Sequence, residues 1–106
     1  MFRIWAKLIK DNKVIKDMIY TVEGEFMVQR FFEYIEEMCH TLDIPIPIVL
    51  TKHIKNFLLF NSTFFTQEDF VETFYEDKFV IEIVKGWVDT PAQPFLHIIL
   101  KMGQNK

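Results

Sequence analysis

The 106-residue sequence has few of the residues that characterise several common kinds of protein. Cys39 is the only cysteine, so no disulfide can form within the chain, and a reducing, intracellular setting is favoured. Three glycines and four prolines are too few for a collagen-like or low-complexity chain. The glycines are also isolated from one another, so no phosphate-binding loop is predicted.

Long apolar runs and basic blocks are missing as well. The longest apolar runs, such as residues 57–60, are far shorter than the ~20 residues of a spanning helix. Charged side chains interrupt residues 1–10, so no signal-peptide core is predicted there. Acidic residues outnumber basic ones, 15 to 12, whereas nucleic-acid binding depends on neutralising phosphates. We therefore expect a cytoplasmic protein with neither a membrane nor a nucleic acid as partner.

Hydrophobic residues are abundant. They make up 50% of the chain, 12 of them phenylalanine, while the net charge is only −3. This balance excludes a disordered chain and supports one domain over residues 1–106. We expect its core to lie within about residues 2–85, followed by a tail over residues 86–106 in which residues 95–100 form an edge strand.

Residues 2–22 are predicted to form a β-hairpin. The apolar alternation favours strands on both sides of the polar residues 11–13. A three-residue loop places Lys7 opposite Asp17, whereas a two-residue loop places it opposite Lys16. Because like charges directly opposite each other are destabilising, we expect the three-residue loop, with Asn12 or Lys13 in the left-handed conformation.

The rest of the chain predicts a mixed fold. An amphipathic helix is expected over residues 25–42, a second helix within residues 48–60, a single turn beginning at Thr66, and a strand from Phe79 to Lys85. The predicted fold class is therefore α+β: a small antiparallel sheet that starts with a β-hairpin and packs against one long amphipathic helix and a second, shorter helix.

Several segments, read in order, resemble a family of small uncharacterised bacterial proteins. The resemblance covers about residues 2–84, and the tail is longer than that family usually carries. It is carried by Arg3-Ile4-Trp5-Ala6-Lys7, Lys10-Asp11-Asn12-Lys13, the Cys39-containing helix that ends near Asp43-Ile44, Pro47-Ile48-Val49-Leu50, the segment from Thr63 to Glu72, and Glu82-Ile83-Val84. The resemblance implies an acidic, intracellular protein and transfers no site residues, because none are established for the family.

Residues with catalytic or metal-binding potential are present but not arranged in known motifs. Cys39 and His40 are adjacent on the predicted helix, so their side chains diverge by about 100° and do not form a reactive pair. His40, His53 and His97 lie on separate elements without the close spacing of a zinc site. Asp69 is better explained as part of a helix cap with Thr66. We expect no catalytic residues, no cofactor and no metal.

The most unusual feature is an aromatic tract over residues 57–75. Most of its rings are expected in the core, and the candidate interface comprises Phe60, Phe64, Phe74 and Trp87. The favoured function is a non-catalytic protein–protein interaction or assembly module, with a homodimer as one form. One alternative is a small-molecule binder or weak enzyme, with a pocket between sheet and helix that uses Tyr20, Tyr34 or His53. Another is an accessory protein of a mobile element or defence system, which binds a basic partner through Glu33, Glu36 and Glu37.

Overall fold

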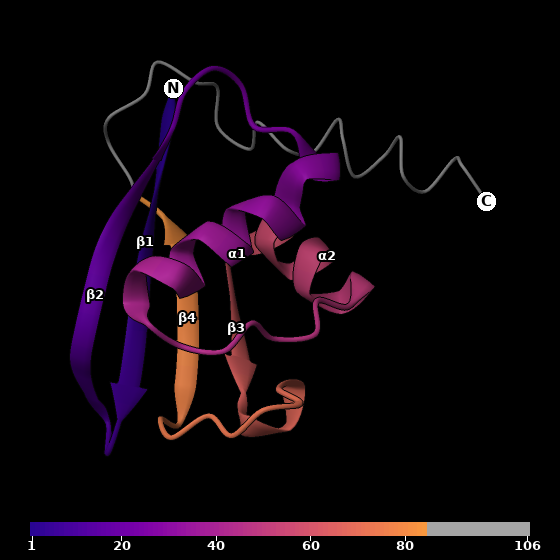
Figure 1. Cartoon of the computed structure of the whole chain (residues 1–106). Helices are drawn as coiled ribbons and strands as arrows, with labels where there is room; N and C mark the ends of the chain where they lie inside the picture. Colours follow the sequence, from indigo (N-terminus) through magenta and orange to yellow (C-terminus); the bar gives the residue numbers. More distant parts are fainter. Residues whose placement is uncertain (85–106) are drawn as a thin grey trace.

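The computed structural model describes residues 1–84, which form a four-stranded antiparallel sheet covered by two helices (Figure 1). The strands are β1 (Phe2–Lys10), β2 (Lys13–Val22), β3 (Ser62–Thr66) and β4 (Lys78–Ile83), in the spatial order β2-β1-β4-β3. The helices are α1 (Phe31–Leu42) and α2 (Thr51–Phe60). The α+β class, the initial hairpin and the two helices agree with the sequence prediction.

The hairpin register is the predicted one, but the turn is not. Lys7 lies opposite Asp17 and Ala6 opposite Met18. The turn has two residues, Asp11 and Asn12, both left-handed with φ of 52° and 63°, as a type I′ turn requires. The register shifts between Leu8 and Ile9, so one extra β2 residue is accommodated there. Because of this bulge, Lys7 lies opposite Asp17 even though the turn has two residues and not the predicted three.

The first helix begins later than predicted. Met27 is extended (φ −122°, ψ 112°), and its backbone N–H donates to the Tyr34 hydroxyl over 3.1 Å. A 3₁₀ turn at Val28–Arg30 then leads into α1 at Phe31. The helix ends at Asp43, which is left-handed with φ of 58°. The Tyr34 contact therefore holds the preceding chain outside the helix.

The second helix and the third strand follow one another closely. Asn61 ends α2 in the left-handed conformation, φ 61°, and β3 starts at the next residue. After β3, the predicted single turn is a 3₁₀ turn at Gln67–Asp69, in which Asp69 Oδ2 accepts the Thr66 N–H over 2.9 Å. The strand β3 itself was not predicted. Its five residues need β4, twelve residues further on, as a partner.

Both helices lie on the same side of the sheet, and the core lies between these two layers (Figure 1). The alternate residues of β1 and β4 that face the helices are almost fully buried. They are Phe2, Ile4, Ala6, Leu8, Phe79 and Ile81. Phe31, Tyr34, Ile35, Met38, Cys39 and Leu42 of α1 complete the layer with Phe57 of α2. Among the described residues, no helix has the length and apolar character needed to cross a membrane.

Candidate functional site

The side of the sheet away from the helices, here called the outer face, carries exposed apolar side chains. The β1–β2 register places Ile19 beside Trp5, and the β3–β4 register places Phe64 beside Val80. Ile19 is 50% exposed and Phe64 47%, while Trp5 and Val80 are partly exposed. In the part of the chain that the structure describes, no helix packs on this face (Figure 1). The described helices therefore cover one face of the hairpin and leave the other face without a helix.

Three charged residues of the outer face, Lys7, Glu82 and Asp17, have partners within the face. The Lys7 ammonium group pairs with the Glu82 carboxylate across β1 and β4, and lies 4.1 Å from the centre of the Trp5 ring. The Trp5 indole Nε1–H donates to Asp17 Oδ2 over 2.8 Å. Lys7 thus faces Asp17 in register but pairs with Glu82. These contacts stabilise charged groups whose burial beneath an apolar partner surface would otherwise be unfavourable.

The four candidate interface residues are not all in one place. Phe60 ends α2 and is 69% exposed, and Phe64 lies on the outer face. Phe74, by contrast, is buried and stacks on Phe70 at a centroid distance of 4.1 Å, so its ring is not part of an exposed patch. Trp87 and the predicted strand at residues 95–100 lie outside the described residues. Trp5 and Ile19 were not among the predicted interface residues, although the alternation of apolar residues along the hairpin was the available signal.

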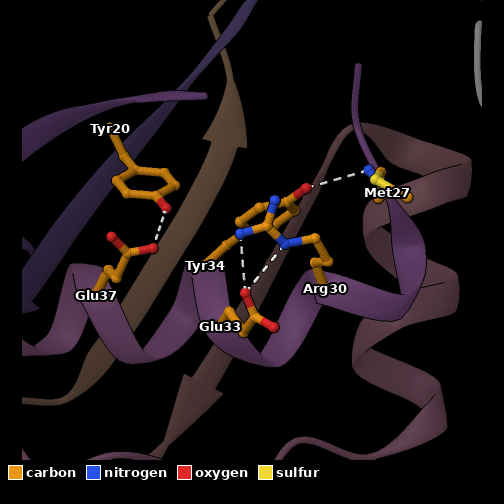
Figure 2. Close-up of polar contacts among 6 residues, drawn as sticks. All are labelled: Tyr20, Met27, Arg30, Glu33, Tyr34 and Glu37. Carbon is orange, nitrogen blue, oxygen red and sulfur yellow. Dashed lines mark hydrogen bonds and ion pairs between the residues drawn. The ribbon is translucent and has the colours of Figure 1, made fainter. Parts of the chain in front are cut away.

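Two of the three candidate pocket residues come together, as Figure 2 shows. The rings of Tyr20 and Tyr34 lie 6.1 Å apart. The Tyr20 hydroxyl donates to Glu37 Oε2 over 2.6 Å, and the buried Tyr34 hydroxyl accepts the Met27 N–H. Burial, together with the hydrogen bond to the Glu37 carboxylate, raises the pKa of Tyr20. Tyr20 therefore keeps its proton and acts as a hydrogen-bond donor.

His53 lies elsewhere, between α2 and β3. Its Nδ1 accepts the Leu50 N–H over 2.9 Å, and its Nε2 lies 3.6 Å from Asp69 Oδ2. Its ring packs on Phe65 at a centroid distance of 4.3 Å. Burial lowers the pKa of His53, although Asp69 acts in the opposite direction. Both ring nitrogens of His53 are already directed at protein groups. The His53–Asp69 pair is therefore suited to stabilising the contact between α2 and the turn after β3, and not to acting as a general base.

The candidate acidic face of α1 is partly neutralised by neighbouring side chains. Arg30 binds Glu33 with both its Nε and a terminal nitrogen, each 3.0 Å from Glu33 Oε2 (Figure 2). Glu37 accepts the Tyr20 hydroxyl, whereas Glu36 is half-buried. The three carboxylates share a helix but do not form one open cluster.

The remaining candidate groups do not converge. Cys39 is fully buried in α1, and burial, with a smaller contribution from Glu36, raises the pKa of its thiol to about 12. His40 is exposed on the neighbouring helix position, and His97 lies outside the described residues. Within residues 1–84, no group of three or more His, Cys, Asp or Glu side chains is arranged to hold a metal ion. A hollow of about 620 Å³ is lined by His40, Asp43 and Glu72 among others, but not by Tyr20, Tyr34 or His53.

No protein-family model, curated protein or solved structure matches this chain. The geometry of the site therefore carries the functional argument alone.

Proposed function

We propose that this chain is a non-catalytic protein-binding module that uses the outer face of its sheet. The observation that carries the proposal is the exposure of Ile19 and Phe64 on a face that also presents Trp5. Ile19 and Phe64 lie on the two edge strands of the sheet, with Trp5 and Val80 on the strands between them. Exposed apolar side chains across one face of a small protein are typical of a binding site. Aromatic side chains contribute much of the free energy of such contacts.

The internal pairing of Lys7, Glu82 and Asp17 on the outer face supports this role. An unpaired buried charge at an interface opposes association, because its lost hydration is not replaced. Lys7 and Glu82 already pair with each other, and Asp17 already accepts the Trp5 indole. A partner that covers this face would therefore bury apolar area without stranding these charged groups.

The state of the nucleophilic and titratable groups supports binding over catalysis. The Cys39 thiol is buried with a raised pKa, which disfavours the reactive thiolate. Tyr20 and His53 both direct their polar atoms at protein groups. A lone buried cysteine also suits a reducing, cytoplasmic setting, and the resemblance described above suits a bacterial one.

Site-specific photocrosslinking tests this function. A photoreactive phenylalanine analogue replaces Phe64 on the outer face, or Val71, which is 84% exposed on the loop after the 3₁₀ turn, as the matched control. We expect a discrete adduct of higher mass in cells with the Phe64 probe and none with the Val71 probe. The adduct should be lost when Trp5→Asp is added to the Phe64 probe variant. The proposal is wrong if the two positions give the same adducts, or if neither gives one.

A further inference from the structure

In the part of the chain that the structure describes, no strand lies beside the outer edge of β2. Among the described strands, β2 pairs only with β1. The Val84 N–H donates to Arg3 O, so Arg3, and with it Trp5 and Lys7, turn their backbone groups toward β4. The alternate residues of β1 then bond to β2, with Ala6 opposite Met18. It follows that Asp17, Ile19 and Thr21 of β2 direct their N–H and C=O groups away from the sheet.

The opposite edge is less open. The Thr66 N–H at the end of β3 is occupied by the Asp69 carboxylate. The helix α2 contacts β3 and extends past it, whereas no described helix extends past β2 (Figure 1). A strand added beside β3 would meet α2, whereas one added beside β2 would not. Of the two edges, that of β2 is therefore the one that residues 1–84 leave open to another strand.

The charges along this edge are complementary to a second, reversed copy of themselves. Lys10 and Lys13 lie at the turn end of the hairpin, and Glu23 and Glu25 follow the other end of β2. All four side chains are exposed. An antiparallel copy brings the basic end of one edge next to the acidic end of the other.

A register centred on Ile19 satisfies the outward backbone groups of this edge. A two-fold axis there pairs Ile19 with itself and Asp17 with Thr21 of the other copy, so that all their outward N–H and C=O groups find partners. Met18 then lies opposite Tyr20, and no like charges face each other. A register centred on Asp17 would place two carboxylates side by side, which is destabilising.

We propose that a second copy of this chain pairs antiparallel with β2 about Ile19, which joins the two sheets into one. The proposal goes beyond the binding function proposed above, because edge-to-edge pairing leaves the outer faces of both copies open. It places the contact at the edge of β2, which borders the outer face through Ile19. Ile15 and Ile19, each about half exposed, supply apolar surface at this seam.

A proline at the seam tests the backbone pairing. Thr21→Pro removes an N–H that points away from β1, and proline is tolerated at such positions of edge strands. Sedimentation velocity on the full chain should give the mass of a dimer at high concentration for the wild type and for Thr21→Val, which keeps the N–H. Thr21→Pro should remain a monomer with an unchanged circular dichroism spectrum. A wild type that is a monomer at every concentration overturns the proposal, including the case in which residues 85–106 of the same chain occupy the edge. A Thr21→Pro variant that still dimerises overturns it too.

Charge reversal provides a second test that does not depend on the proline variant folding. The double variants Lys10→Glu/Lys13→Glu and Glu23→Lys/Glu25→Lys each place like charges together in the proposed dimer. Each alone should dimerise at least about tenfold more weakly than the wild type, and an equal mixture should recover heterodimers. Failure of the mixture to associate, while the wild type dimerises, contradicts the antiparallel seam. A wild type that stays a monomer and still gives the Phe64 adduct would reject this proposal and leave the outer-face function standing.

Discussion

The imidazole Nε2 of His53 on α2 lies 3.6 Å from Asp69 Oδ2, in the turn that follows β3. The same carboxylate oxygen accepts the Thr66 N–H, and the other nitrogen of the imidazole accepts the Leu50 N–H at the start of α2. This pair thus links the beginning of the second helix to the end of the third strand. The neutral imidazole fits this role, because Nδ1 must be an acceptor and Nε2 a donor.

We expect the stability of the protein to fall in mild acid because of His53. Burial lowers the pKa of His53 in the folded state below the ordinary value of about 6.5 that holds in the unfolded chain. The unfolded state then binds the proton more readily, so the contribution of His53 is complete above pH ~7.5. It decreases as the pH falls through ~6.5 and levels off below the folded-state pKa. Urea unfolding midpoints between pH 5 and 8 measure this slope. His53→Gln should flatten it, and an unchanged slope would show that another group is responsible.

Neighbouring phenylalanines of β3 should differ sharply in their effect on stability. Phe65 is fully buried and stacks on Phe79 at a centroid distance of 5.7 Å, whereas Phe64 is 47% exposed. Phe65→Ala should lower the free energy of unfolding by about 3–5 kcal/mol, because it leaves a cavity in the core. Phe64→Ala, the matched control on the same strand, should cost less than about 1 kcal/mol. Equal effects in urea denaturation would contradict the assignment of the two faces.

The hairpin turn should respond to substitutions according to its backbone conformation. Asn12 has φ of 63°, which glycine adopts without strain and β-branched residues adopt poorly. Asn12→Gly should leave stability unchanged or raise it by a few tenths of a kcal/mol, and Asn12→Val should lower it by about 1–2 kcal/mol. Thermal unfolding of the two variants measures this difference. The same loss for both would indicate that the turn is not of type I′.

The Cys39 thiol should be unreactive in the folded protein. It is completely buried, and its pKa is raised to about 12, so almost no accessible thiolate exists at neutral pH. Labelling with a disulfide reagent should therefore proceed no faster than unfolding and accelerate with added urea. A cysteine introduced at the exposed Val71 provides the control and should react at once. Rapid labelling of Cys39 without denaturant would show that α1 opens from the sheet far more readily than the packing indicates.

Local patterns in the sequence determined the hairpin, the two helices and the strand β4. Alternating apolar residues, and the unfavourable placement of Lys7 opposite Lys16 in the other register, were enough to predict the strand register, because both act between close neighbours across one turn. The predicted loop length was wrong, because a two-residue turn combined with a bulge gives the same strand register as a three-residue loop. The late start of α1 also could not be read locally, since it depends on the Tyr34 hydroxyl reaching back to Met27.

Only the tertiary structure decided which aromatic rings are buried and which are available to a partner. Phe64 and Phe74 belong to the same phenylalanine-rich tract, yet one lies on the outer face and the other in the core. The strand β3 depends on β4, and the ion pair of Lys7 depends on Glu82, which is 75 residues away in the sequence. Such contacts join residues distant along the chain, so burial and charge pairing there follow from packing between elements and not from the pattern within any one of them.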